Sequence, residues 1–179
     1  MPMNKIIIDP LKIKESDLPL VVFSDHAWGF INWLIKWRTK GRYNHVMMMI
    51  EPGKLASQSN VFKSIPMKKY LRKGNRLKFW KFKRLTHHQK DYIKYAVRAE
   101  LKKPWWGRRY DYLGILGQAV GISKINNPWL NYCSEIVRRF LCTILMGLPY
   151  HPSPKELNEV FKHDRYKEDI EVLGYWFDD

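Results

Sequence analysis

A short apolar segment closed by a tight turn most constrains how this chain can fold. Residues 43–54, YNHVMMMIEPGK, have the composition of a buried strand, and the Pro52-Gly53 pair predicts a turn at its end. Residues 55–66, LASQSNVFKSIP, are expected to form a second strand that pairs with the first. So short a connection requires an antiparallel pair, because parallel strands need a long crossover.

Further strands and helices occupy separate blocks of the chain. Apolar runs predict strands at residues 18–26 and 76–85, the second with its charges on one face. Apolar spacing and capping residues predict helices at residues 29–41, 66–74, 86–103, 110–121, 133–149 and 153–164. This arrangement favours the α+β class, with a small antiparallel sheet packed against helices. The length of 179 residues predicts a single domain, residues 1–179, whose tail either adds an edge strand or covers a groove.

Composition excludes several classes of protein. Lys and Arg number 32 against 17 Asp and Glu, a net charge of +15, but 45% of the residues are hydrophobic. A disordered polycation would lack that apolar content. No run approaches the roughly 18 consecutive apolar residues of a membrane span, and the first residues lack a cleavable signal pattern. We therefore expect a cytoplasmic or virion-associated protein without a secretion signal.

The positive charge is concentrated in the middle of the chain. Every charged residue from Lys63 to Arg84 is basic, and aromatic residues are interleaved with them. This pattern favours a polyanion partner, whether nucleic acid, an anionic membrane surface or an anionic cell-wall polymer. The alternative is a solvated strand face. The candidate polyanion-binding residues are Lys68, Lys69, Arg72, Lys73, Arg76, Lys78, Lys81, Lys83 and Arg84.

Cys133 is the strongest candidate for chemistry. Pro128 excludes a helix in NNPWLNY, and the apolar periodicity begins directly after the cysteine. Cys133 is thus expected in the first turn of a helix, where unpaired N–H groups and the macrodipole stabilise a thiolate nucleophile. The alternative is a small buried residue, which is what we expect of Cys142 in the middle of the same helix. The two sulfurs, about 13 Å apart along the helix, cannot form a disulfide.

A thiol nucleophile needs a base, and His45 is the leading histidine. It lies in a predicted strand, which is a rigid mount for a catalytic group; the alternative is a hydrogen-bonded core histidine. His26 follows a strand end and is expected near the site. Surface positions are expected for His87, His88, His151 and His163. No spacing resembles a zinc site and no Gly-rich phosphate loop occurs, so no metal or cofactor is expected.

Together these segments resemble the circularly permuted branch of the NlpC-type papain-like cysteine hydrolases (YiiX/YaeF-like). YNHVMMMI is similar to the family's Tyr-Ser-His-Val strand, RRYDYLGILG to its Tyr-Asp-Tyr segment and YCSEIVRRFL to its Cys-Ser-Glu-Leu-Val signature. The segments follow one another in the permuted order over residues 17–160. The resemblance implies a permuted papain-like core with N- and C-terminal extensions and with the cysteine helix laid across the sheet.

The resemblance also implies roles for single residues. Cys133 would be the nucleophile and His45 the general base, with the backbone N–H of Cys133 helping to hold the oxyanion. Relatives often carry a Glu on the strand after the histidine, where this chain reads LASQSN, so Gln58 is the expected orienting residue. Glu51 is disfavoured, since it lies about 20 Å along the strand from His45.

Other residues match the family or the predicted site less directly. Asp111 is expected to be a structural helix cap, and Glu135 to complement the helix dipole. The residues expected to line the substrate site are Asp25, His26, Tyr43 and Tyr132.

The leading function implied by the resemblance is hydrolysis of an amide bond in a cell-wall (peptidoglycan) peptide by a bacterial or phage thiol peptidase. A lipid acyltransferase or thioesterase of the same fold is the alternative, with an apolar or membrane-facing groove flanked by Trp28, Trp33, Trp37, Trp105 and Trp106. The third possibility is a catalytically silent virion or nucleic-acid-binding protein that acts through its basic region.

Overall fold

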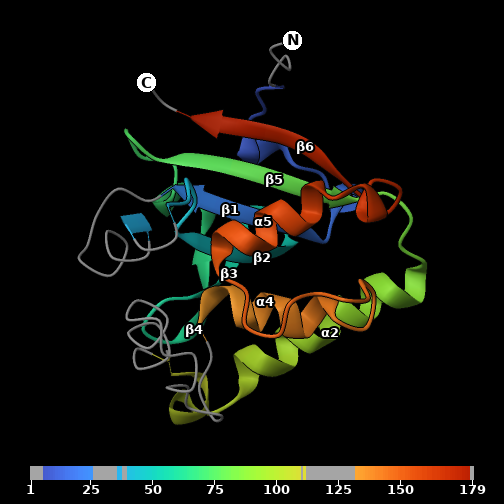
Figure 1. The fold of residues 1–179 in the computed structure, drawn as a ribbon. Coiled ribbons are helices and arrows are strands. Elements are labelled where there is room, and N and C mark those ends of the chain that lie inside the picture. The colour runs from blue at the N-terminus through green and yellow to red at the C-terminus, as the bar shows by residue number, and fades with distance from the viewer. Residues whose placement is uncertain (1–5, 26–35, 38–39, 110, 112–131, 178–179) are drawn as a thin grey trace.

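One antiparallel sheet organises the structure, a computed structural model that describes residues 6–25, 36–37, 40–109, 111 and 132–177. Its six strands lie in the order β4-β3-β2-β1-β5-β6, as Figure 1 shows. The strands are β1 (Leu20–Asp25), β2 (His45–Glu51), β3 (Lys54–Gln58), β4 (Phe62–Pro66), β5 (Arg76–Phe82) and β6 (Ile170–Phe177). With three α-helices in the same part of the chain, the fold belongs to the expected α+β class.

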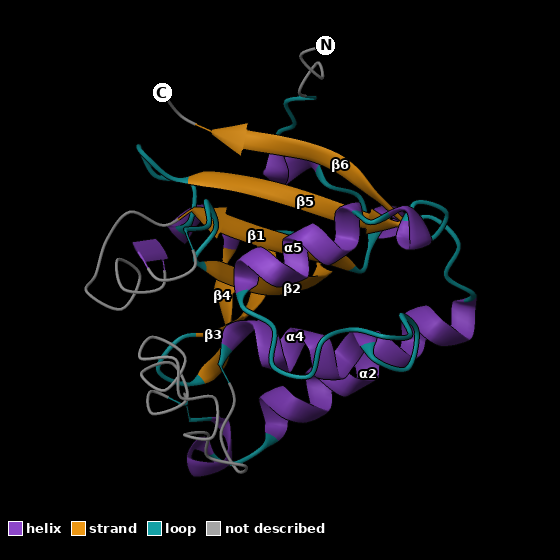
Figure 2. Ribbon diagram, in the orientation of Figure 1, coloured by secondary structure: helices purple, strands orange, loops and turns teal. Residues whose placement is uncertain are grey.

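Both faces of the sheet are buried. On one face lie α2 (His87–Lys102), α4 (Cys133–Leu141) and α5 (Pro154–Lys162), as Figure 2 shows. The N-terminal segment covers the other face, where Ile13 and Leu18 pack on alternate residues of β1 and β2. This double burial explains why both central strands are continuous apolar runs, with no polar alternation.

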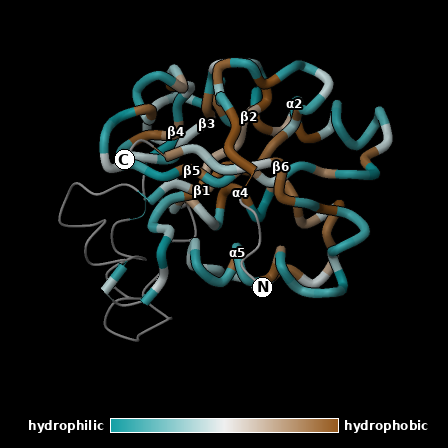
Figure 3. Tube along the Cα trace, turned by 90° about the horizontal axis from the view of Figure 1, so that it is seen from above, coloured by the Kyte–Doolittle hydropathy of each residue, from teal (hydrophilic) through white to brown (hydrophobic). Residues whose placement is uncertain are grey.

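The cysteine helix, α4, is held by an apolar stripe. Ile136, Val137 and Phe140 pack on β2 and β3, and the Phe140 ring lies 5.8 Å from that of Phe62 on β4. Hydrophobic stretches along β2 and around α4 are visible in Figure 3. This packing fixes the position of the N-terminus of α4 relative to the sheet.

α4 is shorter than the predicted helix at residues 133–149. The regular helix ends at Leu141, and the following turns bury Leu145 and Leu148 in the same core. Cys142 therefore lies at the helix end and is exposed, so the expectation that it is a buried mid-helix residue was wrong.

Two other segments differ from the sequence prediction. Residues 55–66 form the two strands β3 and β4, because Ser59-Asn60 makes a turn between them. Residues 66–74 form only a 3₁₀ turn, Met67–Lys69. There the Asn75 amide donates to the carbonyl of Tyr70 at 3.0 Å, a side-chain contact that competes with helix formation.

The charges of β5 do not share one face. Lys78 lies on the helix side with Trp80, whereas Lys81 points to the opposite side and donates to Asp17 at 2.6 Å. Positions 78 and 81 are an odd number of residues apart, and side chains alternate with a period of two along a strand. The prediction of a single charged strand face was therefore wrong.

Local signals located the remaining described elements. Capping boxes at Thr86 and Ser153 begin α2 and α5, as predicted. β1 and β2 lie within the predicted strands, and the chain's tail adds β6 at the sheet edge. The greater part of the helices predicted at residues 29–41 and 110–121 lies outside the described residues. Across the described part of the chain, no helix is long and apolar enough to cross a membrane.

The two edges of the sheet are protected. At the β6 edge, the N–H of Ile8 donates to the carbonyl of Tyr175 at 2.9 Å, so the N-terminal segment lies alongside the strand. A Cβ on Gly174 would meet Ile8 at 2.5 Å, so this close approach requires glycine. The β4 edge is five residues long and exposes Lys63 and Pro66.

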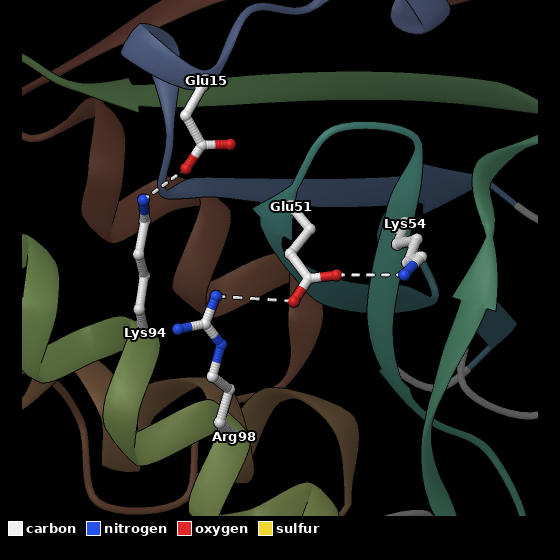
Figure 4. Close-up of polar contacts among 5 residues, drawn as sticks. All are labelled: Glu15, Glu51, Lys54, Lys94 and Arg98. Atoms are coloured by element: carbon white, nitrogen blue, oxygen red, sulfur yellow. Dashed lines mark hydrogen bonds and ion pairs between the residues drawn. The ribbon is translucent and has the colours of Figure 1, made fainter.

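Ion pairs connect α2 to its neighbours (Figure 4). The Lys94 ammonium lies 2.6 Å from Glu15 in the N-terminal segment. Glu51, at the end of β2, accepts from Lys54 at 3.2 Å and lies 3.5 Å from Arg98. Apart from Lys94, whose side chain is mostly buried, these groups are well exposed, so the contacts orient α2 more than they stabilise it.

Replacing Phe140 by alanine is expected to lower the free energy of unfolding by about 3–5 kcal/mol, because the side chain is almost fully buried against Phe62. Tyr95→Ala is the control, since Tyr95 lies on α2 and is 73% exposed; its effect should stay within about 0.5 kcal/mol. Urea denaturation measures both, and equal losses would contradict the packing of α4 described here.

The Asp17–Lys81 contact predicts one component of acid sensitivity. The hydrogen bond from Lys81 holds the pKa of Asp17 below its usual value. The resulting stability is fully present above the unfolded pKa of about 3.9 and is lost as pH falls through the folded value. Asp17→Asn should remove this component, about 0.2–1 kcal/mol for a partly exposed pair. Unfolding curves between pH 2 and 7 measure it, and an unchanged pH profile would rule the contact out.

Candidate active site

Cys133 occupies the first residue of α4. Tyr132 is the N-cap and provides no capping side-chain hydrogen bond. The thiol is almost completely buried, with 1% of the residue exposed. Cys133 therefore lies in the first turn of a helix, as the sequence predicted. The unpaired backbone N–H groups and the positive end of the dipole there favour a thiolate, whereas burial of the sulfur in the apolar core opposes its ionisation.

His45 belongs to a hydrogen-bonded group of three side chains. It begins β2 and is half-buried, and its Nε2 is hydrogen-bonded to the hydroxyl of Ser57 on β3 at 2.8 Å. Ser57 Oγ is in turn hydrogen-bonded to the Tyr70 hydroxyl at 3.0 Å. The rings of His45 and Tyr70 are stacked, with centroids 6.5 Å apart and planes 9° apart. Ser57 and Tyr70 therefore hold the imidazole by one ring nitrogen and one face.

Electrostatics connects this group to Cys133. Burial raises the pKa of Tyr70, the hydrogen bond to Ser57 partly offsets this rise, and the negative charge of a Cys133 thiolate raises the pKa again. Burial and a Cys133 thiolate thus act on the pKa of Tyr70 in the same direction. His45 pairs with Ser24 near the end of β1, on the strand face of Met47 and Met49, whereas Cys133 packs in the core on the helix face. Figure 1 shows α4 beginning at this same end of the sheet.

Gln58, the expected orienting residue, has a different contact. Its amide donates to the carbonyls of Arg108 and Arg109 at 3.1 and 3.0 Å. The neighbour of His45 Nε2 is Ser57, one position away along β3. One residue along a strand reverses the face to which a side chain points, so Ser57 and Gln58 point to opposite faces of β3.

A second histidine lies near the start of α4. The Nδ1 atom of His151 is 2.8 Å from Glu135 Oε1 in the first turn of the helix. The hydroxyl of Ser134 donates to the carbonyl of Pro152 at 2.5 Å, which holds the returning chain against the helix. The prediction of a surface position for His151 was wrong, because the side chain is two-thirds buried in this pair.

Of the residues expected to line the substrate site, Tyr132 adjoins Cys133, whereas Asp25 and Tyr43 have other contacts. Tyr132 is buried next to Cys133, and Asp25 forms an ion pair with Lys36 at the end of β1. Tyr43 packs against Phe23 in the core, and burial raises its pKa to about 12. His26 lies outside the described residues.

Two further carboxylates were considered in the sequence, Glu51 and Asp111. Glu51 lies far from the His45 imidazole, and Asp111 lies in the core. Glu51 is bound to Lys54 and Arg98 at the opposite end of β2 from His45 (Figure 4), as its distance along the strand predicted. Asp111 is completely buried.

The predicted polyanion-binding residues divide into three groups. Lys81 and Arg84 form ion pairs with Asp17 and Glu168, and Lys83 donates to the carbonyl of Lys167. Lys78 is buried. The remaining five predicted residues, Lys68, Lys69, Arg72, Lys73 and Arg76, are exposed and form no ion pair with a described residue; they are here called the basic turn. The basic turn surrounds Tyr70 in the sequence.

Neither comparison of this chain, with protein-family models or with curated proteins, finds a match. Among the described residues, no group of three His, Cys, Asp or Glu side chains is arranged to hold a metal ion.

Replacing Gln58 by alanine is expected to lower the free energy of unfolding by about 1–3 kcal/mol, because two backbone carbonyls lose their donor. Ser64→Ala, at an exposed position of β4, is the control and should change stability by less than about 0.5 kcal/mol. Chemical denaturation compares them. Wild-type stability for Gln58→Ala would show that its amide is not a structural anchor.

Proposed function

We propose that the protein is a cysteine hydrolase of the permuted NlpC type, with Cys133 as nucleophile and His45 as general base. The observation that carries this proposal is the hydrogen bond between His45 Nε2 and Ser57, which holds the imidazole at the end of the sheet where α4 begins with Cys133. In this proposal the sheet and α4 form the permuted papain-like core, and Ser57 takes the orienting role that the sequence assigned to Gln58.

The reaction would proceed in two acyl-transfer steps. The proton of the Cys133 thiol passes to His45 Nδ1, and the thiolate attacks the carbonyl carbon of the substrate. The C–N bond then breaks, the amine leaves with the proton from His45, and a thioester remains on Cys133. Water gives a proton to His45 and attacks the thioester, which releases the acid and restores the thiol. The N–H groups at the start of α4 would stabilise the oxyanion in both steps.

The substrate best supported is a peptide amide bond within an anionic cell-wall polymer, peptidoglycan. Tyr70, which lies among the residues of the basic turn, is hydrogen-bonded to Ser57 in the group around His45. The five cations of the basic turn are exposed and form no ion pair with a described residue. An anionic polymer bound along this surface would be concentrated beside the thiol.

Two observations favour the alternatives. Trp37, Trp105 and Trp106 are more than half exposed, which favours an apolar or lipid substrate and hence an acyltransferase or thioesterase; Trp28 and Trp33 lie outside the described residues. The basic turn by itself favours a silent virion or nucleic-acid-binding protein. Salt-dependent DNA binding that survives Cys133→Ala, without any acyl-enzyme, would support this last function.

The test is the ionisation of Cys133, followed by thiolate absorbance near 240 nm, which does not require a reagent to reach the buried sulfur. A Cys142→Ser background leaves one thiol, since Cys142 is the other cysteine and is exposed. We expect an apparent pKa well below about 8.5, rising toward that value in His45→Ala and less far in Ser57→Ala. Ser64→Ala is the matched control and should not shift it.

An ordinary thiol titration in the parent protein, or the same value in His45→Ala, would refute the proposed pair. Mass spectrometry after incubation with wall peptides or with acyl thioesters then identifies the substrate class. A mass increase on Cys133 with one of the two distinguishes peptidase from acyltransferase chemistry.

A further inference from the structure

A groove of about 1080 Å³ lies between α5 and the strands β5 and β6. Its apolar lining includes Trp80, Phe161, Val172 and Tyr175. Cys133 and His45 are not among its lining residues, so the groove is separate from the candidate active site. In Figure 1, α5 crosses the sheet beside β5, which places the groove on the helix face.

Lys78 is the unusual residue of this groove. It is only 4% exposed, and its ammonium donates to Asn158 Oδ1 at 3.2 Å and lies 4.0 Å from the centroid of the Trp80 ring. The same Asn158 oxygen also accepts from Trp80 Nε1 at 3.2 Å. An ammonium has three donors, and in the described structure Lys78 has no carboxylate partner. A buried charge without a counter-ion is costly.

The other charges around the groove do not neutralise Lys78. Glu159 and Glu168, which also line it, are already paired with Lys162 and Arg84 at 2.7 Å. The third carboxylate of the lining, Glu171, is exposed and lies opposite Lys81, whereas Lys78 lies opposite Tyr175. Three further cations line the groove without an ion pair to a described residue: Lys40, Arg42 and Lys155. The groove is therefore complementary to a negatively charged ligand.

We infer that this groove binds an amphipathic anion, a carboxylate or phosphate carried on an apolar chain, with the anionic group on Lys78. Val172 and Tyr175 lie where the chain would pack, and the volume greatly exceeds that of a bare anion. Burial lowers the pKa of Lys78 to about 8. The ligand binds the protonated form, so affinity should be constant below that pH and fall above it.

The experiment uses isothermal titration of the full chain with laurate, dodecyl phosphate, inorganic phosphate and dodecyl maltoside, each below its micelle concentration. Laurate or dodecyl phosphate should bind at least tenfold more tightly than the neutral amphiphile and inorganic phosphate. The stronger of the two anions identifies the head group. Between pH 7 and 9, binding should weaken about tenfold as Lys78 loses its proton.

Lys78→Met should weaken binding at least tenfold while the protein stays folded, because an apolar residue of similar volume is tolerated in place of a buried charge. Lys63→Met, on exposed β4, is the matched control and should bind normally. If Lys78→Met does not fold, Arg42→Met at the exposed groove wall provides a second test, with an expected loss of at least threefold.

Equal binding of dodecyl maltoside, equally tight binding of inorganic phosphate, or wild-type affinity in folded Lys78→Met would each overturn the inference. Cys133→Ala should bind the anions like the wild type. The groove and the proposed hydrolase activity can therefore fail or succeed separately.

Discussion

The packing of α4 across β2 and β3 is the interaction on which the rest of the structure depends. Ile136, Val137 and Phe140 bury one side of the helix in the core, and this contact determines where the helix begins. Sliding the helix by one turn would move Cys133 about 5.4 Å along its axis, away from the end of β2 where His45 begins the strand. The apolar stripe thus sets the position of the thiol, although none of its residues has a chemical role.

Sequence patterns located the elements whose signals are local. The capping residues at Thr86 and Ser153 predicted where α2 and α5 begin, and continuous apolar runs predicted β1 and β2. Patterns failed where a contact between distant residues decided the outcome. The choice between Ser57 and Gln58 depended on strand register, and the Glu135–His151 pair forms because the chain returns beside the start of α4.

The distribution of charge shows a similar limit. A net charge of +15 predicts attraction to anions, but it does not say which cations are available. In the folded chain, Lys81 is occupied by an ion pair and Lys78 is buried, whereas the basic turn is exposed. Lys81 makes a structural contact and Lys78 lines the groove, because alternate side chains of β5 point to opposite faces of the sheet. The basic turn, most of which precedes β5, forms an exposed surface.

The protected sheet edges determine how this protein can meet other molecules. A strand edge with unpaired N–H and C=O groups invites another chain to add a strand. Here the segment at Ile8 lies along β6, and β4 is short, with Lys63 and Pro66 at its exposed positions. Little main chain is left on which a foreign strand could assemble. Strand addition at these two edges is therefore disfavoured, and the glycine that admits Ile8 contributes to this protection.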